Sequence, residues 1–211
     1  MRIAIALGLA VGLTGSVAWA EQCGPVRGKA GSFDYYLLSL SWSPTYCGTS
    51  SGRNNKQQCG GPQPHGMVVH GLWPQFADGT WPQCCQKVAS VKPSPAVEQA
   101  SKVMIGTRLL SHEWTKHGAC VTSRQDEYFG KINQVTDSLG LAPGLSGSGQ
   151  ERIRVTDLKR HWAVPPAAIT VQCKGTRLKE VHICLNKDLS PIACPEAEVK
   201  TDNCPGTVRL Q

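Results

Sequence analysis

Residues 67–75, MVVHGLWPQ, combine a strand pattern with the first candidates for chemistry. Met67–His70 is a short apolar run that favours a β-strand, and Gly71 and Pro74 turn the chain directly after it. We therefore predict a strand that ends at the histidine. This imidazole, the flexible glycine and the ring of Trp73, which can stack on a nucleobase, favour a binding or catalytic site. A core tryptophan beside a surface histidine is the alternative for this segment alone.

The rest of the chain mixes strand and helix patterns without strict alternation. Residues 48–64 lack an apolar period and predict a loop. This mixture predicts a single α+β domain, in which helices flank a central antiparallel sheet, rather than a doubly wound sheet. The further strands are predicted at 32–42, 168–172 and 178–184, and the helices from Pro95 onward, through 109–116 to an end at Gly118, over 125–139, and from Thr156.

The first 20 residues have the features of a secretory signal peptide. Arg2 precedes an uncharged apolar run, residues 3–13, which is shorter than the roughly 20 residues of a membrane span. Small residues follow at the expected cleavage point. We therefore predict residues 1–20 as a signal peptide and residues 21–211 as one exported domain with no membrane partner, and the signal leaves periplasm and full secretion both open. The remaining formal charge, +6 without Arg2, permits a polyanionic partner.

All cysteines follow the predicted cleavage point, and their number is even. In an exported chain this pattern indicates a disulfide framework. A zinc site is the alternative, but no two cysteines show the short C-x-x-C spacing of such sites. The cysteines are Cys23, Cys47, Cys59, Cys84, Cys85, Cys120, Cys173, Cys184, Cys194 and Cys204.

Residues 112–117, HEWTKH, place four ionisable side chains within six residues of a predicted helix. At about 100° per residue, the four lie within a single arc and can line one cleft. Glu113 is one turn from His117, and we expect its carboxylate to favour the charged form of that histidine. A solvated helix face is the plain alternative. The zinc motif H-E-x-x-H is a sharper one, but His112 and His117 are five residues apart, which is poor geometry for chelating one ion.

Two segments together, HGLWP at 70–74 and HEWTKHGAC at 112–120, resemble the signature blocks of the ribonuclease T2 family of secreted endoribonucleases. The order and separation of the blocks are similar to those of the family, and the likeness is strongest to its bacterial, periplasmic members. Further resemblance lies in residues 33–47, 128–129 and 171–194. The match therefore covers most of the predicted domain.

The resemblance implies a metal-free and cofactor-free cleavage of RNA with low base specificity. His117 corresponds to the family's general base and His70 to its general acid. Glu113 and Lys116 correspond to residues that stabilise the phosphorane, and His112 to the phosphate-binding histidine, which we expect to act protonated. The 2′-hydroxyl of RNA would attack its own phosphodiester, giving a 2′,3′-cyclic phosphate and then a 3′-phosphate.

The base sites depart from the family pattern. Trp73 and Trp81 correspond to aromatic residues of the first base site, but Gln75 replaces an aspartate of some members. At the second base site, Ser41 replaces a glutamine, and the pair 109–110, two leucines, replaces Phe-Trp. We therefore expect a weak second site and broad base tolerance.

The resemblance also implies disulfide pairs, and the sequence leaves other features open. Cys120 is expected to pair with Cys84 or Cys85, between which spacing does not decide. Two further pairs are expected to be Cys173 with Cys204 and Cys184 with Cys194. The pairing of Cys23, Cys47 and Cys59 is not predicted. Three histidines are expected to be structural or at the surface: His65, His161 and His182.

We expect a monomer that binds RNA and has no stable DNA partner. A different class of function stays open beside the enzyme, namely a secreted RNA-binding or cell-surface-acting protein with the same fold and no important turnover. The complete set of ionisable residues in the two blocks favours the enzyme.

Overall fold

The computed structural model describes residues 23–62, 65–141, 145 and 151–210. The predicted signal peptide, residues 1–20, lies outside the described residues and stays a prediction. Within the described part of the chain, no helix is both long and apolar enough to cross a membrane.

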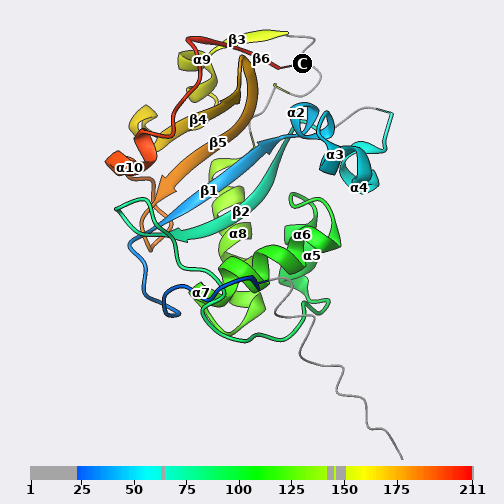
Figure 1. The fold of residues 1–211 in the computed structure, drawn as a ribbon, viewed down its shortest axis with the longest axis vertical. Helices are drawn as coiled ribbons and strands as arrows, with labels where there is room; N and C mark the ends of the chain where they lie inside the picture. The colour runs from blue at the N-terminus through cyan, green and yellow to red at the C-terminus, as the bar shows by residue number, and fades with distance from the viewer. Residues whose placement is uncertain (1–22, 63–64, 142–144, 146–150, 211) are drawn as a thin grey trace, which may run out of the picture.

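A six-stranded sheet forms the centre of the fold (Figure 1). Its order is β2-β1-β5-β6-β3, with β4 paired to β5, and every pairing is antiparallel except the short one between β5 and β6. The prediction of an α+β fold is confirmed, although the sheet is mixed rather than purely antiparallel. The strands are β1 (Tyr35–Trp42), β2 (Met67–Gln75), β3 (Arg152–Arg154), β4 (Ile169–Lys174), β5 (Arg177–Leu185) and β6 (Thr207–Arg209).

Short helices and one long helix surround the sheet. The predicted loop over 48–64 is wrong in part, because two short helices lie within it. Thr49 and Asn55 cap these helices with their side chains, a local signal that apolar periodicity does not reveal. The helices are α2 (Ser43–Cys47), α3 (Ser50–Asn54), α4 (Lys56–Cys59), α5 (Pro95–Ser101), α6 (Thr107–Glu113), α7 (Ala119–Val121), α8 (Gln125–Leu139), α9 (Val155–Lys159), α10 (Glu196–Val199), the π-helix η1 (Trp114–Gly118) and the 3₁₀-helix η2 (Pro166–Ala168).

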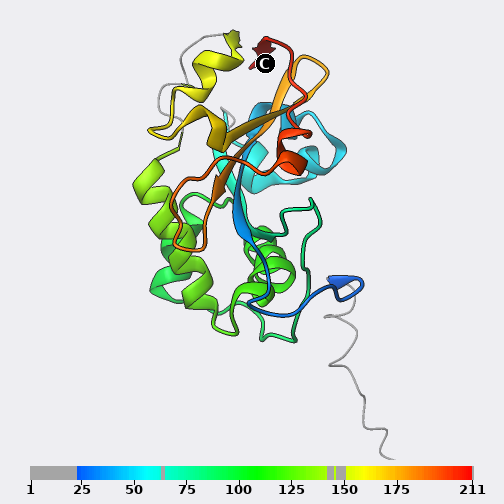
Figure 2. The same cartoon turned by 90° about the vertical axis from the view of Figure 1, so that its left-hand side faces the viewer.

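The two faces of the sheet differ in polarity. Alternate residues of β1 and β5, among them Leu38, Leu40 and Ile183, join the main hydrophobic core with buried side chains of α8. The residues between them point to the other face, where Ser41 pairs with Glu180 and His182 contacts Glu198 of α10. Figure 2 shows α8 and α10 on opposite sides of the sheet.

A β-bulge interrupts β2 at His70. Ser39 of β1 is opposite Gly71, whereas the next residue, Leu40, is opposite Val69, so His70 has no partner across the ladder. The strand continues past the bulge to Gln75, and the prediction that it ends at the histidine is wrong. A bulge of this kind re-aims the side chain of the extra residue. It also shifts the alternation, so that Val69 and Leu72 both face the core.

Five disulfides link the described chain. Cys85, and not Cys84, pairs with Cys120, which decides between the alternatives that the sequence left open. The two C-terminal pairs are those that the resemblance implies. The remaining pairs are Cys23–Cys84 and Cys47–Cys59, beside Cys173–Cys204 and Cys184–Cys194.

Candidate active site

Strand β2 and the α6–η1 segment meet across one cleft of about 430 Å³. The two sequence blocks, about 40 residues apart in the chain, therefore face the same space. All eight predicted site residues line it: His70, Trp73, Gln75, Trp81, His112, Glu113, Lys116 and His117.

Glu113 joins the two blocks. Its side chain is buried, and its Oε2 accepts a hydrogen bond of 2.7 Å from Nε1 of Trp73. Its Oε1 lies 3.7 Å from Nε2 of His70. Gly71 has to lack a side chain here, because a Cβ would overlap both this carboxylate and the indole of Trp73. Burial raises the pKa of Glu113, an effect that the nearby His70 and Trp73 only partly oppose.

His117 lies on the other side of Trp73, with its ring stacked at 5.4 Å between centroids. Burial lowers the pKa of His117 well below its usual value, and the charges of Lys116 and His112 lower it further. The expectation that Glu113 favours a charged His117 is therefore wrong. Residues 114–118 form a π-helix, whose i→i+5 hydrogen bonds widen the turn, so the carboxylate instead faces His70.

His70 has the opposite bias. Burial by itself lowers the pKa of this imidazole, but a hydrogen bond to Glu180 and the charges of Glu113 and Glu180 outweigh it and raise the pKa above 6.5. The Nδ1 atom of His70 lies 3.0 Å from Oε1 of Glu180 on β5. The two histidines of the cleft are thus biased to different protonation states, one charged and one neutral.

His112 lines the same cleft as these two rings. Partial burial lowers the pKa of His112, and Lys116 and His70 lower it further, so the free protein favours a neutral His112. The expectation that this histidine acts protonated concerns the phosphate-bound state and stays a prediction. A neutral imidazole can still donate a hydrogen bond, and an anion in the cleft would favour its protonation.

The residues predicted to recognise a base have different surroundings. Gln75 is buried, whereas Trp81 is 40% exposed at the rim of the cleft and donates from Nε1 to Gln83. A second cleft, also about 430 Å³, lies on the far side of His70 and is lined by Ser41 and Leu109. Leu110 is buried in the core and does not line it.

His182 is a site residue that the sequence reasoning missed. It is 4% exposed, lines the first cleft and meets Trp73 edge to face at 5.8 Å. The period of two along β5 places it on the same face as Glu180, which is the signal that could have found it. His65 is exposed and His161 is half-buried, and neither lines a described cleft.

The described residues hold no group of three or more histidine, cysteine, aspartate or glutamate side chains arranged to bind a metal ion. Among the described residues, no third side chain of these types is placed to bind a metal ion together with His112 and His117.

Comparison with known proteins identifies the family. The family model "Ribonuclease T2 family" matches residues 33–194. The chain is 31% identical over 192 residues to a ribonuclease of Aeromonas hydrophila, a match that covers 81% of this chain and 80% of the relative. The chain therefore belongs to the ribonuclease T2 family, and the resemblance seen in the sequence is confirmed.

Solved structures show the same fold. An RNase-related protein from Calystegia sepium superimposes with a TM-score of 0.62 at 24% identity, covering 87% of this chain and 98% of that one. RNase NT, solved in complex with 5′-AMP, superimposes with a TM-score of 0.60 at 22% identity, covering 78% and 91%.

Proposed function

We propose that the protein is an endoribonuclease that cleaves single-stranded RNA through its 2′-hydroxyl without a metal ion. The observation that carries the proposal is the pair His70 and His117, which line one cleft with pKa shifts in opposite directions. General acid–base catalysis of phosphodiester transfer needs one imidazole that accepts a proton and one that donates.

In the proposed first step, neutral His117 removes the proton of the 2′-hydroxyl. The oxygen attacks the adjacent phosphorus, a 2′,3′-cyclic phosphate forms, and the bond to the 5′-oxygen breaks. Protonated His70 gives its proton to this departing oxygen. In the second step the roles reverse, since His70 is then neutral and activates water, while His117 returns a proton to the 2′-oxygen and leaves a 3′-phosphate.

The charge that develops on phosphorus has partners within the cleft. Lys116 supplies a cation, and His112 becomes protonated as the phosphate binds, so both act where negative charge grows. Glu113 keeps a raised pKa because of its burial, and its carboxyl group can share a proton with a phosphoryl oxygen. These roles follow the family's pattern, and the lining of the cleft supports them.

Base recognition is proposed to be broad. The ring of Trp73 stacks on the base upstream of the cut, with Trp81 and Gln75 at the same cleft. The second cleft receives the downstream nucleoside, and Ser41 and Leu109 stand there in place of the glutamine and the aromatic residue of other family members. Tyr46, Asn55 and Gln58 also line this cleft, so the broad tolerance is proposed from the replaced positions alone. Dinucleotides that differ in either base should therefore be cut at similar rates.

The test is cleavage of mixed-sequence RNA by the oxidised protein in excess chelator, from mildly acidic to alkaline pH. We expect metal-independent activity with a bell-shaped profile, whose acid limb lies below pH 6.5 because the pKa of His117 is lowered, and whose alkaline limb lies above it because that of His70 is raised. Loss of activity with chelator, or cleavage of a strand without 2′-hydroxyls, would contradict the mechanism.

A folded protein that binds RNA but does not cut it would favour the alternative of a binding or cell-surface-acting protein. Export of residues 21–211 after removal of residues 1–20 is also proposed. Five disulfides support it, since such bonds persist in oxidising compartments. One relative is named "Extracellular ribonuclease LE", from Solanum lycopersicum.

A further inference from the structure

Behind His70, a chain of alternating histidine and glutamate side chains crosses the polar face of the sheet. His70 contacts Glu180 at 3.0 Å, Glu180 lies 3.7 Å from Nε2 of His182, and Nδ1 of His182 lies 2.9 Å from Glu198. Glu180, His182 and Glu198 are each at most 10% exposed at the side chain. Buried ionisable groups are held in place only when they are paired, so these four form one unit.

The hydrogen bond to Glu180 fixes the proton of His70. A carboxylate only accepts hydrogen bonds, so Nδ1 of the imidazole carries the hydrogen that faces it. The Nε2 atom then points to the cleft side, towards Glu113, and bears the proton that can be transferred. The bulge at β2 gives His70 this orientation, with one nitrogen on β5 and the other on the cleft.

Glu180 is itself held from three directions. Ser41 of β1 donates a hydrogen bond of 3.2 Å to Oε1, and Lys179 lies 3.2 Å from Oε2. His182 approaches the same Oε2. The carboxylate thus has contacts on both oxygens and little freedom to leave His70.

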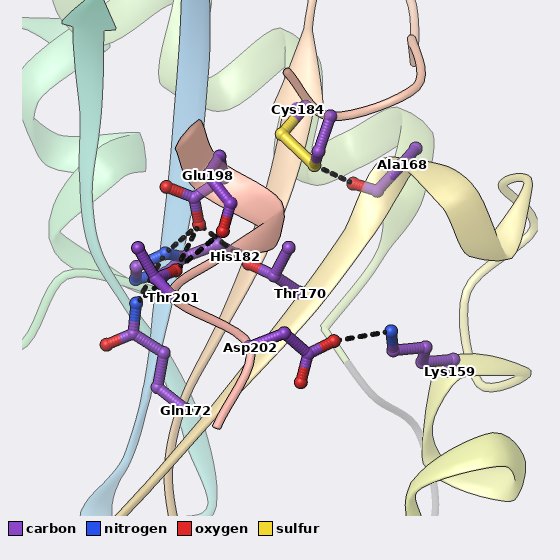
Figure 3. The surroundings of a disulfide bond; sticks show 10 residues. Lys159, Ala168, Thr170, Gln172, His182, Cys184, Glu198, Thr201 and Asp202 are labelled. Atoms are coloured by element: carbon purple, nitrogen blue, oxygen red, sulfur yellow. Dashed lines mark hydrogen bonds and ion pairs between the residues drawn. A yellow bond between two sulfur atoms is a disulfide. The ribbon is translucent and has the colours of Figure 1, made fainter. Parts of the chain in front are cut away.

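The far end of the chain is held by α10. Figure 3 shows Glu198 turned towards His182, with Thr170 and Thr201 against its carboxylate. Thr170 donates a hydrogen bond of 2.7 Å and Thr201 one of 3.1 Å to Oε1. Disulfides precede and follow α10 at Cys194 and Cys204, and each ties the segment to a strand of the sheet, β5 and β4 respectively. Both C-terminal disulfides thereby help to fix Glu198.

We propose that Glu180 is a positioning residue for His70, and that His182 and Glu198 hold Glu180 in place. The proposal rests on the role of His70 as general acid in the proposed function. It predicts that the β5 carboxylate keeps the ring in the tautomer and orientation that present a proton to the departing 5′-oxygen, and that it stabilises the charged ring before transfer.

The charged groups around His70 shift its pKa in opposite directions, and the effect of the carboxylates is the larger. Glu180 from β5 and Glu113 from α6 favour the charged ring, whereas His182 disfavours it. A charged His70 in turn disfavours protonation of His112 and His117, from the α6–η1 segment. Arg108 of α6, Lys116 of η1 and Lys179 of β5 are further cations of this region, the last in contact with Glu180. Removing the Glu180 charge should therefore lower the pKa of His70.

The test is the substitution Glu180→Gln, which keeps shape and hydrogen-bonding capacity but removes the charge. For a dinucleotide, we expect the alkaline limb of kcat/KM to move down by about one pH unit, so that activity on this limb falls by up to about tenfold, as loss of one close opposite charge implies. For a nucleoside 3′-nitrophenyl phosphate, whose leaving group departs without a proton, the loss should be less than about twofold. The matched control is Glu196→Gln on α10, whose exposed carboxylate pairs only with exposed Lys200.

Equal losses of activity on both substrates, without movement of the alkaline limb, would overturn the proposal and leave Glu180 a structural residue. A variant with unchanged activity and pH profile would also overturn it. If Glu180→Gln does not fold, NMR of the imidazole nitrogens in the wild type still decides. A neutral His70 should carry its proton on Nδ1 and titrate above 6.5, and the Nε2 tautomer would contradict the proposal. If the wild type is inactive although neutral His70 carries its proton on Nδ1, the proposed function has failed and the positioning of His70 by Glu180 has not.

Discussion

His70 and His117 line the same cleft, but the groups around them carry opposite charges. His70, on the bulge of β2, lies between the carboxylates of Glu113 and Glu180. His117, in the π-helix, is buried and has the cation of Lys116 as its neighbour along the chain. The first ring therefore favours its charged form and the second its neutral form.

Residue type alone therefore does not assign a catalytic role. Both imidazoles have an ordinary pKa of about 6.5, at which either could act as acid or base. Their surroundings separate the two roles in advance, so that at one pH a proton acceptor and a proton donor are both in the correct state. Substitution of each ring, or of its neighbours, tests this separation of roles.

Replacing either ring should have the largest effect. We expect His70→Ala and His117→Ala each to lower kcat/KM for RNA by about 10² to 10⁴, the usual contribution of a general acid or base. A nitrophenyl leaving group should restore most of the activity of the His70 variant, because no proton is needed there, and none of that of the His117 variant. Rescue of both variants, or of the His117 variant alone, would refute the assigned roles.

Lys116→Gln should have the next largest effect. Loss of a cation that stabilises the transition state should reduce kcat about 100-fold. The charge of Lys116 also lowers the pKa of His117, so its removal should move the acid limb of the pH profile to higher pH. Stopped assays across the pH range check both effects, with Lys87→Gln as control, since that lysine is exposed and lines neither cleft. An acid limb that stays in place would argue against His117 as the base.

A smaller effect is expected for Trp73, whose ring contacts both histidines. Trp73→Phe keeps a ring for stacking but removes the donor to the buried Glu113 carboxylate. A hydrogen bond to a charged group contributes about 2 kcal/mol, so kcat/KM should fall about 30-fold. Trp81→Phe is the matched control at the exposed rim and should change it less than about twofold. Equal losses in the two variants would show that the contact with Glu113 is unimportant.

The smallest effect on catalysis and a clear one on stability are expected for Glu198→Gln. The variant should lose about 2 kcal/mol of unfolding free energy, since a buried imidazolium loses its charged partner. The pKa of His182 is raised in the fold, so its contribution is full below about pH 6.5 and fades as the pH rises through the folded pKa. The pKa of Glu198 is lowered, so its contribution is present above about pH 4.5 and fades at lower pH.

Denaturant unfolding at several pH values checks this prediction, with Glu196→Gln expected to change stability by less than about 0.5 kcal/mol. A difference between Glu198→Gln and the wild type that is independent of pH would mean that His182 and Glu198 are not a charged pair.

Several features of the site could be predicted from short stretches of sequence. The blocks around His70 and His117 are each contiguous, so composition and spacing indicate their chemistry, and the structure brings both to one cleft. The strands over 168–172 and 178–184 could also be predicted from apolar patterning, and the structure has β4 and β5 there.

Other features failed for identifiable reasons. The arc calculated for residues 112–117 assumed an α-helix, but residues 114–118 adopt π-helical hydrogen bonding, which changes which side chains are neighbours. The predicted strand at 67–70 is shorter than β2, because a glycine and a proline inside a bulged strand look like a turn. His182 was assigned a structural or surface place, because its partners come from other elements.

The family and the α+β class could be read from the sequence, because each depends on contiguous residues or on the period of an element, and the resemblance to the family supplied the eight predicted cleft residues. The tertiary structure alone decided which proton state each histidine favours. Glu180 is 110 residues from His70 in the chain, and its contact exists only because β1 brings β2 and β5 into one sheet. Electrostatic environment depends on distance in space, and no local pattern encodes that distance.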